Sequence, residues 1–369
     1  MRIGFHAPFP PARTGVADYA EALAEALGRH GEVLRNPARA CDVELYHLGN
    51  NQLHRRMHML ALERPGVAVL HDAVLHHFFL GCLGRRAYVE EFVHNYGEWR
   101  RDLAERLWEQ RARSAQEPTY FQYPMLRRIA EQATVIVVHN PAAAELVRAH
   151  VPRARIVEIP HLFRRPELPP ACEAIRLRAG LGVAPSATLF GVFGYLRESK
   201  RLGSVLRAFA RLRRSRQDAA LLLAGQFASR DLERAIAPAL AQAGVRRVGY
   251  LSEQEFWRYA CAIDVCINLR YPAAGETSGI AIRMMGIGKA VILTAGSESA
   301  GLPEAACLRV DPGLGEEEML VEYMAWLANS PGAAREIGRK ASLHVAQEHD
   351  VAHCAERYFA LLSGDSSGP

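Results

Sequence analysis

Residues 275–289 read GETSGIAIRMMGIGK and place a glutamate just ahead of a helix that begins with small residues. The backbone amides of Ser278, Gly279 and Ile280 are expected to point out of the helix start, where the helix dipole is positive. Gly279 allows an anion such as a phosphate to approach the backbone closely. The stretch therefore predicts an anion site.

Glu276 precedes this predicted anion site, with Thr277 beside it. A carboxylate repels a phosphate, so we interpret Glu276 as a hydrogen-bond acceptor for hydroxyl groups attached to that phosphate, as on a sugar. A nucleotide-sugar carries both chemical groups, and residues 276–280 are all assigned to its binding site.

The chain of 369 residues is too long for one ordinary core, so we expect two domains with a cleft. It is 49% hydrophobic and 23% charged, which is typical of a globular protein. No apolar run is long enough to span a bilayer, and residues 1–5 resemble a buried strand rather than a signal peptide. We therefore expect a cytoplasmic protein without a transmembrane segment.

Cysteine and charge patterns exclude several classes of site. Seven cysteines are scattered along the chain without a C-x-x-C pair, so they indicate neither a disulfide framework nor a zinc site. The net charge of +5 comes from dispersed arginines, which favours a local basic patch over a nucleic-acid-binding stripe. We expect no metal, no cofactor and no nucleic-acid partner.

Short apolar runs alternate with helical stretches along the whole chain. This rhythm predicts an α/β protein with two doubly wound, Rossmann-like domains. The expected strands lie at residues 3–5, 43–46, 67–70, 135–138 and 155–159 in the first half, and at 189–193, 220–224, 247–250, 265–268 and 290–293 in the second.

Domain boundaries follow from a shift in composition, because prolines gather between residues 160 and 186. We interpret residues 76–131, an arginine-rich helical excursion, as an amphipathic cover on the first domain; acceptor recognition or contact with a membrane surface is the alternative. The expected division is an N-terminal domain at 1–165, a linker at 166–186, a C-terminal domain at 187–348, and a C-terminal helix with a disordered tail at 349–369.

Ligands of open α/β sheets gather at the carboxyl ends of the strands, so the loops there are candidate sites. After the first expected strand, Gly15 opens a helix behind a proline-stiffened loop that lacks the G-x-G-x-x-G pattern. Gly15 could still let a ligand approach. Asp18 either binds sugar hydroxyls or complements the positive helix start.

His71 and Asp72 follow the strand expected at 67–70, where His71 would point into the cleft. His71 and His76 are five residues apart, and no acidic D-x-D pair accompanies them, so the spacing argues against a metal site. We prefer a neutral histidine that forms a hydrogen bond with a substrate hydroxyl.

Further polar residues of the first domain are candidates for contact with an acceptor. They suit a hydroxylated acceptor, whereas loop capping and turn chemistry are the alternative. Polysaccharide, lipid-linked oligosaccharide, protein and small-molecule acceptors all stay open. The acceptor-side candidates are Asp18, Asn50, Asn51, His54 and Asp72.

Gly194 opens a cationic loop after the first strand of the second domain, with Arg197, Lys200 and Arg201 ahead of the next helix. Only three of the 45 basic residues are lysines. A lysine at position 200 therefore either serves to bind a phosphate or reflects codon drift at a solvated position without a functional role. If this loop and residues 276–279 border the same face of the domain, a diphosphate can bridge them.

Taken in order, these motifs resemble the family 4 retaining glycosyltransferases, of GT-B architecture, over nearly the whole chain. GT-B enzymes have two Rossmann-like domains that face each other across a cleft. Tyr250 and Arg270, in phrases that resemble bacterial members, are added to the donor site. The family's glycine loop, cleft histidine, Gly…Lys loop and Glu-x-Phe-Gly helix start are matched here by Gly15, His71, Gly194 with Lys200, and Glu276 with Gly279.

The resemblance implies metal-independent transfer of a sugar from a nucleoside diphosphate donor, with retention at the anomeric carbon. Lys200 would neutralise the diphosphate as its bond to the sugar breaks. Glu276 would hold sugar hydroxyls, and His71 would contact the sugar from the first domain. Such enzymes act in bacterial glycan, glycolipid or glycoconjugate biosynthesis.

Two positions depart from the family pattern. The second family glutamate, eight residues after the first, is Met284 here, or Arg283 if the match is anchored on residues 288–289, which leaves ribose recognition open. The arginine that usually follows the loop glycine is Tyr195. Its replacement is sought among Arg197, Arg201 and Arg270.

Two other classes of function stay open. A nucleotide-sugar epimerase or hydrolase would use acid and base groups, for which His71, Asp72 and Glu276 are available. A non-catalytic protein that binds sugar nucleotides is the other, because fold does not fix function. Met284 and Tyr195 are the features that favour it.

Overall fold

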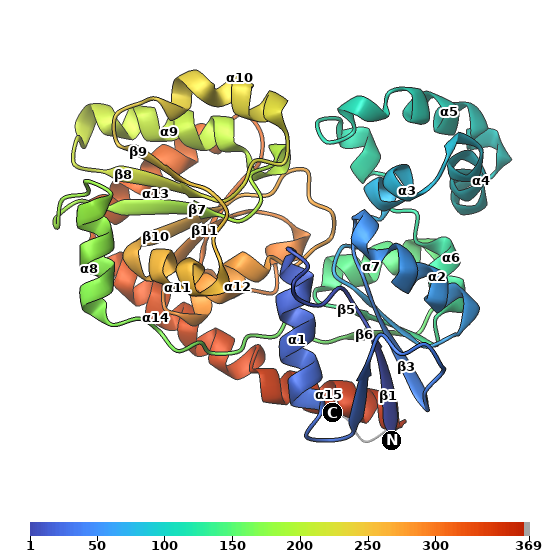
Figure 1. Ribbon diagram of the computed structural model, residues 1–369. Helices are drawn as coiled ribbons and strands as arrows, with labels where there is room; N and C mark the ends of the chain where they lie inside the picture. Colours follow the sequence, from blue (N-terminus) through green and yellow to red (C-terminus); the bar gives the residue numbers. More distant parts are fainter. Residues whose placement is uncertain (365–369) are drawn as a thin grey trace. The chain divides into compact units, whose positions relative to one another are not determined.

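The computed structural model describes residues 1–364, so the tail expected at 365–369 lies outside the described part. The chain forms two compact units (Figure 1). Unit 1 contains Met1–Arg164, Pro272–Thr277 and the C-terminal segment from Glu348, and unit 2 contains Arg165–Tyr271 and Ser278–Gln347.

Unit 1 is built on a six-stranded sheet in the order β2-β1-β3-β4-β5-β6, with every neighbouring pair parallel. Its central strands are buried on both faces, which explains their continuous apolar runs. The strands are β1 (Arg2–His6), β2 (Glu32–Arg35), β3 (Val43–Leu48), β4 (Val67–Leu70), β5 (Val135–Val138) and β6 (Ile156–Glu158).

Helices cover both faces of this sheet. Alternate residues of β4 and β5 point to opposite sides: Val69 and Val137 join a core with α1 and α15, whereas Ala68 and Ile136 join a core with the remaining helices. The helices of unit 1 are α1 (Gly15–Leu27), α2 (Arg55–Glu63), α3 (His76–Cys82), α4 (Arg85–Tyr96), α5 (Arg101–Glu109), α6 (Arg127–Gln132), α7 (Pro141–His150) and α15 (Val351–Ser363), with 3₁₀ turns η1 (Gln52–His54), η2 (Glu98–Arg100), η3 (Arg111–Arg113) and η4 (Pro118–Phe121).

The excursion at 76–131 contains α3, α4, α5 and the first part of α6. Its apolar residues, among them Tyr88, Phe92 and Leu107, are buried in the same core as β4 and β5. The segment is thus an amphipathic cover, although Trp99 stays 75% exposed.

Unit 2 repeats the architecture with a second parallel sheet in the order β12-β11-β10-β7-β8-β9. In Figure 1, α9 and α10 lie on one side of these strands, and α11 and α12 lie on the other. The strands are β7 (Leu189–Phe193), β8 (Ala220–Ala224), β9 (Val245–Val248), β10 (Val265–Asn268), β11 (Ala290–Thr294) and β12 (Leu308–Val310). The helices are α8 (Ala171–Gly180), α9 (Leu202–Ser215), α10 (Arg230–Leu240), α11 (Glu253–Ala262), α12 (Gly279–Gly286), α13 (Glu316–Asn329) and α14 (Pro331–Glu348), with 3₁₀ turns η5 (Glu198–Lys200), η6 (Ser297–Ser299) and η7 (Glu304–Ala306).

The prediction of two doubly wound α/β domains is confirmed, whereas several boundaries differ from the expected ones. The segment expected as a linker at 166–186 contains α8, which Arg178 ties to Asp264 of unit 2. The short edge strands β2 and β12 were not expected, and β9 begins and ends two residues earlier than predicted.

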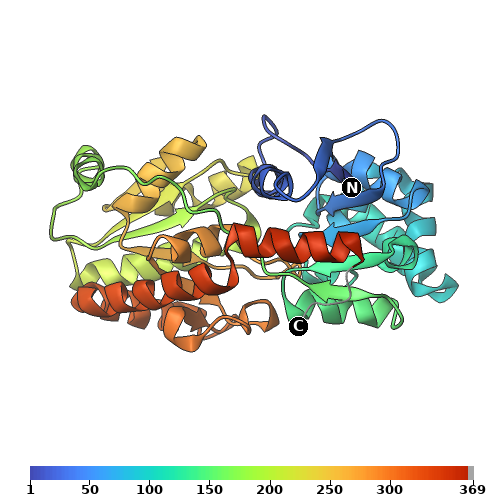
Figure 2. The same ribbon diagram turned by 90° about the horizontal axis from the view of Figure 1, so that it is seen from below.

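The C-terminal helix α15 belongs to unit 1 and packs beside α1 (Figure 2). The hydroxyls of Tyr19 and Tyr358 lie 3.0 Å apart at this contact, and both side chains are buried. The sequence predicts the helix but not its place beside α1, because an apolar face does not indicate which sheet it covers.

Candidate functional site

The order of strands in the sheet of unit 2 reverses at β7: the chain adds β8 and β9 on one side of β7 and then β10, β11 and β12 on the other. Such a reversal leaves a crevice at the carboxyl ends of the two strands, where open α/β sheets bind ligands. The loop after β7 carries Lys200, and β10 ends at Asn268. The topology therefore brings these two residues to one place.

Asn268 connects the lysine turn to the start of α12. Lys200 is 4% exposed, and its Nζ lies 3.5 Å from Asn268 Oδ1. The amide Nδ2 of Asn268 donates to Ser278 Oγ at 2.8 Å. Arg270 adds a second cation, because its Nη2 donates to the same oxygen at 3.3 Å. Two cationic side chains thus converge on one helix start.

Ser278 is the N-cap of α12, and its Oγ accepts from Ala281 N at 3.3 Å. Gly279 and Ile280 are the first two helical residues, so their amides lie at the positive end of the helix. The predicted helix start is therefore confirmed. An ammonium, a guanidinium and helix-start amides together favour a bound anion.

Gly194 turns the chain at the end of β7 with φ +90°, a conformation that favours glycine. Gly225, at the end of β8, has φ +150°, and a Cβ there would lie 1.9 Å from Gly194 O. A side chain at Gly225 would therefore displace the Gly194 turn that leads to Lys200, whereas at Gly194 the positive φ alone disfavours a side chain.

The loop Pro272–Thr277 belongs to unit 1 and contacts the segments that follow β4 and β5. The amides of Ala73 and Val74 both donate to Ala274 O, at 2.9 and 3.0 Å. Asn140 Nδ2 donates to Gly275 O at 3.1 Å and to Thr277 Oγ1 at 3.0 Å. Glu276 is thereby held in unit 1, whereas the following helix belongs to unit 2.

Glu276 itself is 8% exposed, and its Oε2 accepts from Ala274 N at 2.6 Å. Thr277 donates to the carbonyl of His139 at 3.2 Å and so faces β5. Thr277 therefore anchors the loop, and these contacts explain its position without a contact between its hydroxyl and the sugar-nucleotide donor.

His71 follows β4 in the same unit and lies against two other histidines. Its Nε2 is 3.0 Å from His47 Nδ1, and its ring centre is 5.1 Å from that of His139. Burial and the neighbouring imidazoles lower the pKa of His71 well below 6.5, and burial lowers the pKa of His139 to about 4. His71 is therefore neutral at physiological pH, so one of its ring nitrogens can donate a hydrogen bond and the other can accept one.

The candidates for acceptor contact are mostly explained by local structure. Asp72 Oδ2 accepts from Asn50 N at 2.7 Å, and Asn50 Oδ1 accepts from Phe78 N at 2.8 Å. Asn51 caps η1 through Leu53 N. His54 is fully buried and its Nδ1 donates to His47 O at 2.9 Å, so local structure accounts for its position.

The remaining candidates lie on the surface or near it. Gly15 is the first residue of α1, with space around its Cα, and Asp18 is exposed one turn later. Tyr250 is 49% exposed just after β9, and Arg197 precedes η5. A ligand could reach these positions, but the contacts within each unit give no further evidence that they form part of a site.

The two residues that could stand at the position of the second family glutamate have distinct environments. Met284 is fully buried and cannot bind a ribose hydroxyl. Arg283 Nη2 lies 2.6 Å from both carboxylate oxygens of Glu253, with its guanidinium stacked over Phe256 and Trp257. This arrangement brings Glu253 to the α12 side of the sheet.

Sequence reasoning missed Asn268, Asn140, His47 and Glu316. Asn268 ends β10, His47 is the next-to-last residue of β3, and Asn140 lies two residues beyond β5. Closeness to the carboxyl end of a strand is a usable signal, but polar residues at strand ends are common. Glu316 carried no local signal, because its partner Arg201 is 115 residues away.

Within residues 1–364, no three His, Cys, Asp or Glu side chains gather in a way that could hold a metal ion. Over the same residues, no helix has both the length and the apolar character needed to cross a bilayer.

Residues 187–329 match the family model described as glycosyl transferases group 1. The matched region contains Lys200, Asn268 and the start of α12. No curated protein matches the sequence.

Solved structures of glycosyltransferases share the fold over nearly the whole chain. Sucrose-phosphate synthase of Thermosynechococcus elongatus is 16% identical, with a TM-score of 0.70 over 98% of each chain. HepE of Anabaena, in complex with UDP and glucose, is 16% identical, with a TM-score of 0.69 over 99% of this chain and 100% of that one. WaaG, a glycosyltransferase involved in lipopolysaccharide biosynthesis, is 14% identical, with a TM-score of 0.62 over 99% and 100%. The two-domain α/β fold is that of the GT-B glycosyltransferases.

Proposed function

We propose that the protein is a retaining, metal-independent glycosyltransferase of family 4, which moves a hexosyl group from a nucleoside diphosphate to a hydroxylated acceptor. The observation that carries the proposal is the connection of buried Lys200 to the start of α12 through Asn268. A diphosphate bound there would meet an ammonium and helix-start amides together. The group 1 family match covers these residues.

In this proposal the leaving diphosphate is stabilised by fixed charges rather than by a metal ion. Lys200, Arg270 and the amides of Gly279 and Ile280 would lower the energy of the negative charge that develops as the sugar bond breaks. Glu276 would accept hydrogen bonds from sugar hydroxyls, and neutral His71 would bind a further hydroxyl. With no second carboxylate assigned as nucleophile, the acceptor hydroxyl would attack from the face that the diphosphate leaves, and the departing phosphate would take the hydroxyl proton.

UDP-sugars are the first donors to examine, because HepE structures of the same fold contain UDP and UDP-glucose. The proposed acceptor is a hydroxyl of a sugar, lipid, protein or small molecule in glycan, glycolipid or glycoconjugate synthesis. A cytoplasmic site of action, at the membrane where the acceptor is a lipid, is part of the proposal.

Calorimetric titration with UDP, GDP, TDP and ADP, in EDTA and then in Mg²⁺, tests the donor site. We expect one nucleotide to bind in EDTA at about micromolar affinity, and Lys200→Ala to weaken it by about 100-fold. Lys340→Ala is the matched control, since Lys340 is exposed and lies 3.8 Å from Glu336. Absence of binding by every nucleotide would contradict the proposal.

Turnover of the donor, measured with and without an acceptor, distinguishes a transferase from the other two classes of function. An epimerase or hydrolase converts the donor fully without acceptor, a non-catalytic protein binds without turnover, and a transferase needs an acceptor. Detection of a covalent sugar–enzyme adduct by mass spectrometry would overturn attack from the departing face.

A further inference from the structure

An arginine in the left-handed backbone conformation connects helix α9 to the turn that carries Lys200. Arg201 has φ 56° and ψ 34°, between η5 and α9, and its side chain makes no capping hydrogen bond to the helix. Glycine adopts this conformation easily, whereas a residue with a Cβ is strained in it. Arginine at this position therefore requires a compensating interaction.

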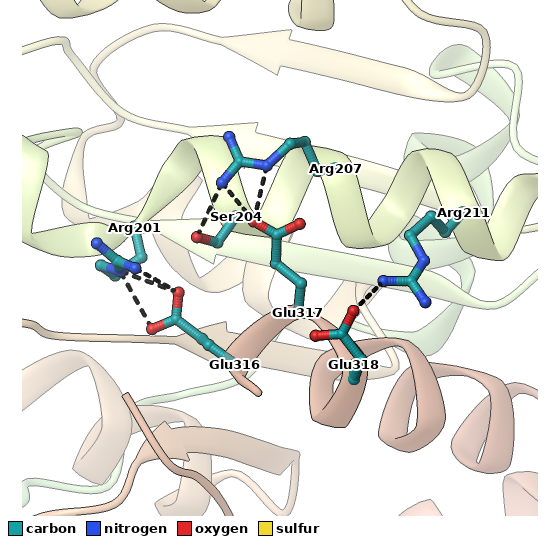
Figure 3. Close-up of polar contacts among 7 residues, drawn as sticks. All are labelled: Arg201, Ser204, Arg207, Arg211, Glu316, Glu317 and Glu318. Carbon is teal, nitrogen blue, oxygen red and sulfur yellow. Dashed lines mark hydrogen bonds and ion pairs between the residues drawn. The ribbon is translucent and has the colours of Figure 1, made fainter. Parts of the chain in front are cut away.

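Glu316 provides that interaction (Figure 3). Arg201 Nε lies 2.9 Å from Glu316 Oε1 and 3.1 Å from Oε2, and Arg201 Nη2 lies 2.9 Å from Oε1. Glu316 is the first residue of α13, and its side chain is 2% exposed, compared with 33% for Arg201. A carboxylate buried to this extent depends on its cation, so the pair fixes the direction of the arginine.

Two further pairs between the same helices provide a contrast. Figure 3 shows Arg207 and Arg211 of α9 reaching Glu317 and Glu318 of α13. Both pairs are more exposed than the first, and surface pairs of this kind contribute little. Of the three, the Arg201–Glu316 pair alone is buried on its acidic side and adjoins the lysine turn.

The lysine turn is fixed from two directions. Tyr271 N donates to Ser199 O at 2.8 Å, which ties the turn to the loop after β10. On the other side, Arg201 ties it to α13. Lys200 lies between these attachments, with its Nζ 3.5 Å from Asn268 Oδ1. A change at Glu316 therefore reaches Lys200 through a single peptide unit.

We propose that Glu316 is a positioning residue, which acts through Arg201 to hold the turn at 198–201 so that the Lys200 ammonium stays beside Asn268, where the donor diphosphate binds. This inference rests on the proposed function, which gives Lys200 that task. In this role Glu316 acts through Arg201 rather than by contact with the substrate. Its carboxylate stabilises the left-handed turn that glycine would otherwise be needed to form.

The lysine signals in an NMR spectrum test this role without substrate. Lysine labelled with ¹³C at Cε gives three side-chain signals, because the chain has three lysines, and Lys200→Arg assigns one of them. We expect Glu316→Gln to shift the Lys200 signal and to leave that of Lys289, which donates to Cys261 O and Ile263 O. Glu318→Gln is the matched control and should shift none. An unchanged Lys200 signal in Glu316→Gln overturns the proposal. Glu316→Asp, which keeps the charge but shortens the reach, gives the same comparison if the glutamine variant does not fold.

Calorimetry with UDP adds a rescue experiment. We expect Glu316→Gln to weaken UDP binding by about tenfold or more, and Glu317→Gln and Glu318→Gln to change it by less than about twofold. The double variant Arg201→Gly/Glu316→Gln forms the turn unaided, so its affinity should return to within about threefold of wild type. A double variant as weak as Glu316→Gln overturns the proposal. If wild type binds none of the four nucleotides UDP, GDP, TDP and ADP, the donor site proposed above is overturned, whereas the lysine signals still decide the role of Glu316.

Discussion

His47 Nδ1 lies 3.0 Å from His71 Nε2, so one imidazole donates a hydrogen bond to the other. The second nitrogen of His47, Nε2, is buried and has no hydrogen-bond partner. A buried N–H without an acceptor is rarely found in folded proteins. We therefore infer that His47 carries its proton on Nδ1 and donates a hydrogen bond to His71 Nε2. The neutral ring of His71 then carries its own proton on Nδ1.

The first prediction concerns this tautomer. Long-range ¹H–¹⁵N spectra at pH 7 should show His71 neutral and protonated on Nδ1, with His71→Asn used for assignment. His47→Asn, whose amide can still donate, should keep that state, whereas His47→Leu should release it. A wild-type His71 protonated on Nε2 would contradict the inference.

The second prediction concerns acid stability of unit 1. Burial lowers the pKa of His58 to about 4, from an unfolded value of 6.5. Above pH 6.5 both states are neutral, whereas between pH 6.5 and about 4 the unfolded chain binds a proton that the folded chain does not, so stability falls as pH falls. At pH 5 the free energy of unfolding is therefore lower by about 2 kcal/mol because of this single group.

His58→Leu should remove that loss. His58 packs against Phe78 and Phe79, which suits an apolar replacement. Urea unfolding of unit 1, followed by hydrogen exchange at pH 7 and pH 5, should show a smaller difference between the two pH values in the variant. His353→Leu, at an exposed position of α15, is the control. Equal pH dependence in wild type and His58→Leu would show that the buried histidine does not titrate as inferred.

The central strands and the start of α12 could be predicted from the sequence, because their signals are local. Continuous apolar runs mark strands that are buried on both faces, and small residues after Glu276 mark a helix start. The edge strands β2 and β12 are short and only partly buried, so their sequences lack such runs. The helix α8 lies in a proline-rich stretch, where composition favours a linker.

Residues that act through distant partners could not be predicted. The docking of residues 272–277 onto unit 1 depends on Asn140, more than a hundred positions earlier in the chain. Likewise, the partner of Arg201 is set by the packing of α13 on α9, which periodicity alone does not reveal. The chemistry of Lys200 and Glu276 was visible in the sequence, but the residues that hold them were not.

The third prediction concerns the close approach of two loops. Gly225→Ala would place a Cβ against Gly194 O at a φ of +150°, so we expect unit 2 to lose about 3 kcal/mol of stability. Gly180→Ala, at the end of α8 with open space around it, should change stability by less than about 0.5 kcal/mol. Thermal unfolding of both variants is the measurement. A neutral Gly225→Ala would mean that the two loops separate easily.

The fourth prediction concerns the charge beside Lys200. Asn268→Asp would place a carboxylate next to the ammonium and repel a diphosphate, at a cost of about 3 kcal/mol, or roughly 100-fold in UDP affinity. Asn268→Ala loses the hydrogen bonds to Lys200 and Ser278 without adding a charge, and should weaken UDP binding by about tenfold. Calorimetry should therefore rank wild type, alanine and aspartate in that order, and an aspartate variant that binds as tightly as alanine would argue against a diphosphate at this position.

The last prediction separates the two tasks of Asn140. Its Oδ1 caps α7 by accepting from Ala143 N at 2.9 Å, whereas its Nδ2 donates to the loop that carries Glu276. Asn140→Asp keeps the cap, since a carboxylate accepts the same bond at a positive helix start. It also sets an oxygen against Gly275 O, which pushes the loop away. Displacement of Glu276 by about 1 Å would lower kcat by about 100-fold with little change in thermal stability. Asn140→Ala loses both tasks and should be less stable as well. Full turnover by Asn140→Asp would show that Glu276 does not depend on this anchor.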